Sequence, residues 1–347
     1  MKKLRIGIVG LGRVASKTHI PVLKSLESVE VVAGAEKNPE RAERVKSLFG
    51  LARVYDSYED MFESEGLDGV YVCLPTFLHK DACIKALERG LHVLCEKPMG
   101  MSVKEAEEMT ALAEAKGLVL MPGYKKRYAK NFKRAKELIE DGLLGKIIQV
   151  QGTFVTPGPY ISWDPKSDWY LDEKWHGVIY DIGCHLVDLL LYLVPFDIIN
   201  VKVVSQHGFK GYSTPTNVAC SFEMEGGLVG NLTVGWRAST DILSLSVHGT
   251  AGSINVSQDY FTYVNSQTDP VDKIKMVLEN AYSACGSLLQ KVKDKVHGNN
   301  FYIEDLLQAK AFVTAISKIQ KAPIDGNDAI RIHKFLEKMI LVKPFLA

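Results

Sequence analysis

The sequence has no excess of either charge. Lys and Arg together number 42 and Asp and Glu number 41, so the formal net charge is only +1. A chain without a basic excess has no long-range field that draws it to nucleic acid or to an anionic membrane. We therefore expect neither nucleic acid nor a membrane as a partner and favour a small polar molecule.

Cysteine is also scarce, and the six cysteines include no Cys-x-x-Cys pair. Their spacing from one another and from histidines does not match that of zinc ligands, so we expect no metal site. Scattered cysteines without a disulfide framework are typical of a reducing compartment, and the expected location is the cytoplasm.

Long apolar runs are missing as well, since no stretch reaches the ~20 residues that a membrane-spanning helix needs. The longest, near 186–194, contains Asp188 and ends at Pro195. The chain has 347 residues, of which 46% are hydrophobic and 24% charged. Such a chain is expected to form a compact enzyme of about two domains.

Residues 4 to about 121 alternate short β-branched runs with helical patterns, which is typical of a parallel sheet with crossover helices. Strands are expected at 4–9, 29–35, 53–55, 69–74, 91–95 and 118–121, and helices near 13–26, 39–49, 57–64, 77–89 and 102–117. Ser102 and Glu105 form a capping box at the start of the last helix. We assign a first, α/β domain to residues 1–122.

The pattern then changes to strand-like runs joined mostly by short glycine-containing turns, which predicts a mainly antiparallel sheet. The expected strands are 147–155, 200–206, 216–224, 228–236, 243–248 and 252–256, with helices near 131–140, 181–193, 272–294 and within 302–346. We assign an α+β domain to residues 123–347 and allow its C-terminal helices to pack back on the first domain.

A glycine-rich turn follows the first expected strand. Gly10, Gly12 and Ala15 form the pattern Gly-x-Gly-x-x-Ala at a strand-to-helix junction. Backbone amides and the helix dipole at such a junction can hold a pyrophosphate, although a glycine turn that binds nothing is the alternative. Glu36 ends the second strand, where a carboxylate accepts hydrogen bonds from the adenosine ribose and repels a 2′-phosphate. The sequence therefore favours NAD, while the neighbouring Lys37 leaves NADP open.

Residues that carry chemistry follow three further strands: Leu74, Pro75 and His79; Glu96, Lys97 and Pro98; and Tyr124. The carboxyl ends of strands are where such a sheet places function. On the expected helix 181–193, Asp181 and His185 are four residues apart, so they share a face as a base with its orienting carboxylate. Asp188 lies three residues from His185, so the spacing leaves open which aspartate orients the ring. A structural His–Asp pair inside an apolar helix is the alternative.

In this order the segments resemble the glucose–fructose oxidoreductase / inositol 2-dehydrogenase family (Gfo/Idh/MocA) over nearly the whole chain. The matching segments are GLGRVA at 10–15, EKNPERA at 36–42, Pro75 with His79, EKP at 96–98, DIGCH at 181–185 and PIDG at 323–326. The combination is specific, whereas any one segment is not.

The resemblance implies an N-terminal Rossmann domain that binds NAD(P) and a C-terminal domain whose open-faced sheet forms dimer or tetramer contacts. It implies an oxidoreductase for a polyhydroxylated substrate such as a sugar, an inositol or a nucleotide sugar. Lys97, Asp181 and His185 match the catalytic set: His185 takes the hydroxyl proton, Lys97 stabilises the alkoxide, and Asp181 orients His185 or a neighbouring hydroxyl. Expected cofactor contacts are Gly10, Gly12, Arg13, Val14, Glu36, Lys37, Leu74, Pro75, His79, Glu96 and Lys97.

The expected substrate contacts are Tyr124, Arg127, Trp163, Trp169 and His176. Many relatives carry three glycines where this chain has residues 175–177, Trp-His-Gly, which changes the shape of the substrate mouth. The aromatic-rich segment 159–176 usually indicates buried packing. Alternatively, Trp163 and Trp169 stack on a sugar ring or nucleobase and Lys166 or Lys174 meets a phosphate, which would indicate a nucleotide-linked substrate.

Two rival functions have weaker support. The stretch 125–136 carries seven cations with interleaved aromatics, which we interpret as an active-site border followed by a solvated helix face rather than a nucleic-acid patch. A regulatory or scaffold protein that binds NAD(P) without turnover is the other alternative. A mere sensor does not need Lys97, Asp181 and His185 together.

Overall fold

The computed structural model describes residues 3–159, 171–207, 213–265, 269–272, 274–275, 277–278, 281, 285, 303–318 and 320–341. The chain divides into two compact units. The first comprises Met1–Lys125 with Asp294–Ile330, and the second comprises Lys126–Lys293 with Arg331–Ala347.

The first unit is a parallel sheet wound with helices. Its described strands run in the order β3-β2-β1-β4-β5-β6, and every neighbouring pair is parallel. They are β1 (Leu4–Val9), β2 (Val29–Ala35), β3 (Arg53–Tyr55), β4 (Gly69–Val72), β5 (His92–Cys95) and β6 (Leu120–Pro122). The chain order reverses between β1 and β4, and sheets of this kind bind ligands outside the carboxyl ends of the strands at that point.

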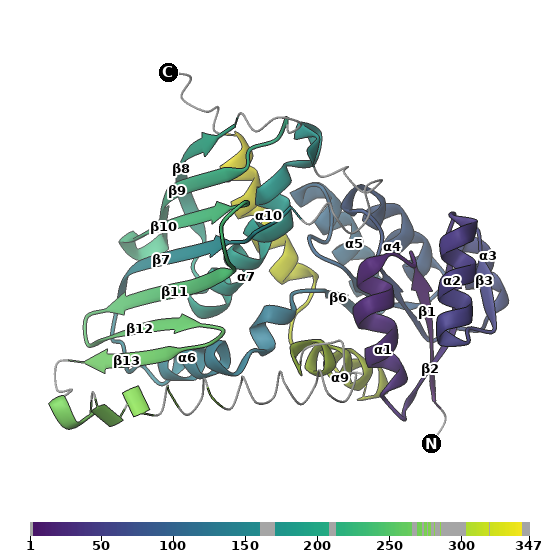
Figure 1. Cartoon of the computed structure of the whole chain (residues 1–347), viewed down its shortest axis with the longest axis horizontal. Coiled ribbons are helices and arrows are strands. Elements are labelled where there is room, and N and C mark those ends of the chain that lie inside the picture. Colours follow the sequence, from purple (N-terminus) through teal and green to yellow (C-terminus); the bar gives the residue numbers. More distant parts are fainter. Residues whose placement is uncertain are drawn as a thin grey trace. The chain divides into compact units, whose positions relative to one another are not determined.

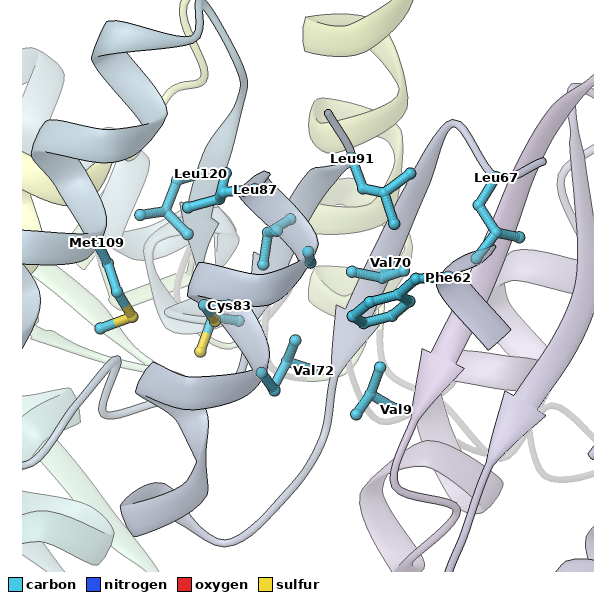
Figure 2. Close-up of a cluster of buried hydrophobic side chains, with 14 of the residues drawn as sticks. Val9, Phe62, Leu67, Val70, Val72, Cys83, Leu87, Leu91, Met109 and Leu120 are labelled. Carbon is cyan, nitrogen blue, oxygen red and sulfur yellow. The ribbon is translucent and has the colours of Figure 1, made fainter. Parts of the chain in front are cut away.

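Helices cover the sheet because its central strands are apolar on both faces; β4 is buried at every position. Figure 2 shows Val70 and Val72 of β4 in one buried cluster with Phe62, Cys83 and Met109, which come from three of the covering helices. The helices of this unit are α1 (Ile20–Lys24), α2 (Pro39–Phe49), α3 (Tyr58–Ser64), α4 (His79–Glu88), α5 (Val103–Ala115) and α9 (Ile303–Lys318).

The strands and helices expected in this half are present, with two local differences. The helix expected near 13–26 begins as a π-helical turn, η1 (Ala15–His19), which continues into α1. Ser102 caps α5 by accepting the Glu105 N–H at 3.2 Å, as the capping box predicts. The Glu105 carboxylate instead accepts the Met101 N–H at 2.7 Å, one residue before the cap.

The second unit contains a sheet with the order β13-β12-β11-β7-β10-β9-β8. Its described strands are β7 (Ile147–Val155), β8 (Ile198–Gln206), β9 (Asn217–Met224), β10 (Leu228–Gly235), β11 (Ile242–Gly249), β12 (Gly252–Ser257) and β13 (Phe261–Asn265). All neighbouring pairs are antiparallel except β10 and β7, which are parallel, so the predicted mainly antiparallel sheet is confirmed. The sequence analysis did not predict β13, whose short run is half-buried throughout and has no apolar alternation.

Among the described residues, helices cover one face of this sheet and leave the other open. Figure 1 shows α6 (Lys130–Glu140), α7 (Cys184–Leu193) and α10 (Gly326–Leu341) on the same side of the strands. In β9, Phe222 points to that side and meets Phe335 of α10, with ring centroids 5.3 Å apart. Ser221 is exposed on the other side and donates to Asn231 of β10 at 2.7 Å.

The C-terminal helical region consists of α9 and α10, which Pro323 separates because proline cannot continue a helix. In the described part of the chain one helical stretch, Glu173–Leu193, is long and apolar enough to cross a membrane, with a mean hydropathy of 1.2. The sequence analysis expected no such stretch. Its most apolar window is 83% buried inside the structure, and a core helix of a soluble protein passes the same test.

A buried ion pair joins α7 to η3 (Lys125–Tyr128), the turn that precedes α6. Asp188 is 0% exposed, and its Oδ1 accepts from Arg127 Nε at 2.7 Å. The guanidinium also lies over the Tyr192 ring, 5.2 Å from the centroid. Removing one partner of such a pair leaves the other charged and buried, which costs more than the pair contributes.

We predict that Asp188→Ala lowers the free energy of unfolding of the second unit by about 3–5 kcal/mol, because Arg127 loses its counter-charge. Urea denaturation followed by tryptophan fluorescence measures the change. The control is Asp197→Ala, which removes the exposed pair with Arg331 (3.3 Å) and is expected to cost less than about 1 kcal/mol. Equal losses in the two variants would contradict the prediction.

Candidate active site

The glycine turn lies directly after β1, at the switch point of the first sheet. Gly10 has φ +86°, and a Cβ on it would lie 2.8 Å from the Cys73 carbonyl oxygen. A Cβ on Gly12 would meet nothing within 4 Å. Gly10 is therefore required by the fold, whereas Gly12 leaves open space at the helix start. Arg13 and Val14 are exposed beside it.

Glu36 ties this turn to the end of β2. Its carboxylate accepts the N–H groups of Leu11 at 3.1 Å and Asn38 at 2.9 Å. Arg41, in the first turn of α2, places Nη1 3.3 Å from Glu36 Oε2. Lys37, the alternative cation suggested by the sequence, is exposed, and Arg41 was not predicted. The position of Arg41 could have been inferred from the helix start at the Asn38 cap, because the first turn of α2 lies next to the end of β2.

Buried side chains connect the strand ends of β4 and β5. His79 is 1% exposed, with Nε2 2.8 Å from the Leu74 carbonyl oxygen and Nδ1 2.9 Å from that of Pro98. Burial lowers the pKa of His79, although the two carbonyl contacts and the Glu96 carboxylate act in the opposite direction. Pro75 precedes the short turn η2 (Thr76–Leu78) that leads into His79. The Lys97–Pro98 peptide bond is cis.

The pKa of Glu96, the residue before Lys97, is strongly lowered. Its Oε1 lies 2.7 Å from His19 Nε2, and its Oε2 accepts the Lys97 N–H at 3.1 Å. Burial raises the pKa of Glu96, but the hydrogen bond from His19 and the charge of Lys97 outweigh it and lower the pKa to about 2. The carboxylate is therefore ionised at any working pH. Sequence reasoning did not single out His19.

The loop after β6 places Tyr124 and Lys125 against α9. Tyr124 is 0% exposed, and Lys125 Nζ lies 2.7 Å from Oδ1 of Asp305, which is buried. Gln308 of the same helix accepts the Tyr124 and Lys125 N–H groups once its amide is oriented for these donors. The start of the basic stretch 125–136 is thus held by α9, which is distant in the sequence.

In the second unit, Asp181 lies in a π-helical turn, η7 (Ile179–Gly183), and His185 lies in the first turn of α7. The expected single α-helix is therefore replaced by two helical geometries, and π-helical turns are common at functional sites. Asp181 Oδ2 accepts from the indole Nε1 of Trp236 at 3.1 Å. His185 is 8% exposed and its ring lies 6.3 Å from that of Phe154.

Trp236 was not predicted as a site residue, because it stands alone at the end of β10 and its partner is 55 positions away in sequence. It is 2% exposed, so its indole holds Asp181 from inside the core. Asp188 is engaged by Arg127, as described above, and Arg127 is itself buried by this pair. The structure therefore gives the two aspartates of this helix different partners.

His176 and Gly177 both have positive φ, 62° and 44°. A Cβ on Gly177 would lie 2.0 Å from Thr214 Oγ1, so that position requires glycine. His176 is half-buried, its ring packs on Tyr180 with centroids 4.7 Å apart, and burial lowers its pKa. The left-handed backbone explains why glycine is suited to this segment and why a larger residue needs a packing partner.

Trp163 and Trp169, with most of the aromatic segment, lie outside the described residues. In the basic stretch, the ammonium groups of Lys126, Lys133 and Lys136 lie over the rings of Phe154, Tyr128 and Tyr192 at 5.8, 5.4 and 5.6 Å. Among the residues that the structure describes, no group of three or more His, Cys, Asp and Glu side chains is placed to hold a metal ion.

A sequence model of the oxidoreductase family with an NAD-binding Rossmann fold (Gfo/Idh/MocA) matches residues 4–124. The model of the Gfo/Idh/MocA C-terminal domain matches residues 132–255, and together the two matches cover more than half of the chain. The chain belongs to the Gfo/Idh/MocA oxidoreductase family. The resemblance inferred from the motifs is confirmed.

Two relatives and one solved structure illustrate the similarity. D-glucoside 3-dehydrogenase of Escherichia coli (strain K12) is 31% identical over 61% of this chain and 59% of that protein, so the chain spans less than two thirds of it. An uncharacterized oxidoreductase of Rhizobium meliloti is 27% identical over 97% of this chain and 96% of that protein. The WlbA dehydrogenase of Bordetella pertussis, solved with NADH and UDP-GlcNAcA, shares the fold with a TM-score of 0.84. It is 20% identical and covers 98% of this chain and 95% of that one.

The residues present fit the NAD that this family binds. The open space at Gly12 lies at the start of a helix, where backbone N–H groups face an anion. Glu36 lies beside the same turn with its carboxylate at the end of β2. Gly12 with the exposed Arg13 and Val14 would hold the pyrophosphate, and Glu36 the adenosine ribose.

The two glycines provide a test that separates folding from binding. We predict that Gly10→Ala lowers the free energy of unfolding by about 1–3 kcal/mol, because its φ and the Cys73 carbonyl both exclude a side chain. We predict that Gly12→Ala unfolds like wild type but binds NAD at least about tenfold more weakly, a loss of ~1.4 kcal/mol. Urea denaturation and NADH fluorescence titration measure the two quantities. A Gly12→Ala variant with wild-type NAD affinity would show that the open space is not the phosphate site.

Proposed function

We propose that this protein transfers a hydride between NAD and a secondary alcohol or ketone carbon of a sugar-like substrate. The observation that carries the proposal is the setting of Asp181 and His185. Asp181 is partly exposed and held by Trp236, whereas the nearby Asp188 is buried in an ion pair. Asp188 serves the fold, whereas a partly exposed carboxylate held by an indole suits a role towards a substrate.

In the proposed reaction, bound NAD supplies the hydride acceptor at its nicotinamide ring. His185 takes the proton of the substrate hydroxyl, and the Lys97 ammonium stabilises the negative charge that develops on that oxygen. Asp181, positioned by Trp236, orients His185 or a neighbouring substrate hydroxyl. In the reducing direction His185 returns the proton to the oxygen.

The substrate class proposed is a free sugar, an inositol or a nucleotide-linked sugar. Two comparisons support different ends of this range, since one relative is named a D-glucoside dehydrogenase and the WlbA structure contains UDP-GlcNAcA. A nucleotide-linked sugar would be large enough to contact segment 159–176, whereas with a smaller substrate the segment would only pack as a loop. The contact stays a prediction. The rival function, an NAD-binding regulator without turnover, has no need of Lys97, Asp181 and His185 together.

We further propose that the first unit binds the cofactor and the second binds the substrate and a second copy of the chain. The open face of the second sheet supports this, because its exposed Ser221 and Asn231 form a cross-strand polar contact suited to a wet interface. A homodimer or homotetramer in the cytoplasm, with no membrane or nucleic-acid partner, is the proposed state. The near-zero net charge and six cysteines without a disulfide, all of them described, support that location.

The catalytic assignment is tested by Lys97→Ala and His185→Ala. Each is expected to lower turnover by roughly 10²- to 10⁴-fold while NAD affinity stays near wild type, because each acts on the substrate oxygen. Turnover is followed by NADH absorbance on a panel of free sugars, inositols and nucleotide sugars. The controls are the exposed Lys116→Ala and His207→Ala, which should react like wild type. Normal turnover by Lys97→Ala would refute the assignment, and no turnover of any substrate by wild type would favour the regulator.

The cofactor preference follows from the contacts of Glu36. We predict that wild type binds NAD about 10- to 100-fold more tightly than NADP, since the carboxylate is held toward the ribose by two N–H groups. Glu36→Ser should narrow or invert this preference, because Lys37 and the released Arg41 then face a 2′-phosphate. Adding Arg41→Ala should restore part of it. Fluorescence titration with both cofactors measures the ratio, with the exposed Glu43→Ser as control; a wild type that prefers NADP would contradict the prediction.

A further inference from the structure

The carboxylate of Glu96 stands beside Lys97 and is held from two sides. One oxygen lies 2.7 Å from His19 Nε2, and the other accepts the Lys97 N–H at 3.1 Å. The side chain of His19 is only 5% exposed and that of Glu96 only 17%. A charged carboxylate with so little exposure costs free energy unless it is paired, so the His19–Glu96 contact stabilises this loop.

His19 reaches Glu96 because of the π-helical turn that follows the glycine turn. The backbone N–H of Ile20 bonds to the carbonyl of Ala15, five residues earlier, so η1 is wider than an α-helix. The wider turn changes the direction of His19 from that in a regular α-helix. The imidazole lies edge-on to Tyr71 of β4, with ring centroids 5.1 Å apart. The π-helical turn therefore ends at His19, whose side chain contacts Glu96, the residue before Lys97.

Several titratable groups face Glu96 from the surrounding elements. They are His19 from η1, Lys97 from the same loop, His79 from α4, and the thiols of Cys73 and Cys95 at the ends of β4 and β5. Burial raises the pKa of both thiols well above the usual value, so both are neutral. Glu96 therefore carries a negative charge, and the charge of Lys97 is one of the causes that lower its pKa.

We propose that His19 and Glu96 are a positioning pair for Lys97, in which His19 holds the Glu96 carboxylate and that carboxylate holds the Lys97 backbone and places a negative charge beside this lysine. The pair connects the helix of the phosphate-binding turn to the residue that stabilises the substrate oxygen. This inference rests on the proposed function of Lys97. In this proposal both residues act through Lys97, because their contacts run from His19 to Glu96 and from Glu96 to the Lys97 N–H.

The decisive experiment measures the titration of Lys97 directly, without substrate. Lysines of the full-length protein are dimethylated with ¹³C, and the Lys97 resonance is assigned by its loss in Lys97→Arg. In Glu96→Gln the Lys97 resonance is expected to titrate about one pH unit lower than in wild type, because the neighbouring negative charge is gone. A purely structural role for Glu96 would not move this titration.

The matched control is Asp68→Asn. Asp68 also accepts a strand N–H, that of Arg5 at 2.7 Å, but it precedes β4 and so lies at the opposite end of the same sheet. It should leave the Lys97 titration unchanged. A Lys97 titration in Glu96→Gln that coincides with wild type would overturn the proposal. A shift of the same size in Asp68→Asn would do so as well, because the effect would then be general.

Kinetics test the role of His19. His19→Leu is expected to lower kcat about tenfold with little change in the NAD dissociation constant, because Lys97 loses its fixed position and the phosphate site does not. His19→Gln, whose amide can still donate to Glu96, should recover most of this loss and also guards against a variant that fails to fold. Equal losses in the two folded variants would count against the pair. If Lys97→Ala is fully active, the catalytic role of Lys97 fails, and the NMR titration still decides whether Glu96 holds its charge.

Discussion

Hydrogen bonding of backbone groups that lie beyond the ends of the parallel strands is the constraint on which the first unit depends. A buried N–H or C=O without a strand partner must find another, or the loop costs free energy. His79 meets the carbonyl oxygens of Leu74 and Pro98, and Glu96 accepts the Lys97 N–H. These buried polar side chains complete the fold at the same edge of the sheet where this family binds its cofactor.

Side chains at these strand ends complete the fold at the edge where this family binds its cofactor, so folding and chemistry are difficult to separate in this unit. Glu36 holds the glycine turn by accepting the Leu11 N–H, and its carboxylate is also the group that we propose binds the adenosine ribose. Gly10 and Gly12 look equivalent in the motif but are not equivalent in space. One is enclosed by the Cys73 carbonyl, and the other faces open space. A residue at such a strand end therefore serves the fold, the ligand or both, depending on what lies next to it.

The second unit divides two similar aspartates between these tasks. Asp188 is fully buried and neutralises Arg127, so its removal would leave a buried charge. Asp181 is partly exposed, lies in a π-helical turn and is held by the indole of Trp236. By helical spacing alone both aspartates are within reach of His185, so the sequence could not show which one orients its ring. Their partners, Arg127 of η3 and Trp236 directly after β10, are distant in sequence.

Local pattern determined much of this protein from the sequence alone: the alternating strands and helices of the first half, the mainly antiparallel sheet of the second, the glycine turn and the family. These depend on neighbours in the chain, through side-chain period, caps and turns. Tertiary structure decided the π-helical turns, the β10–β7 parallel pair, and the partners of Asp181, Asp188 and Glu96. Apart from the π-helical turns, each of these features joins residues far apart in the sequence, and a single sequence carries no periodicity that relates His19 to Glu96 or Asp181 to Trp236.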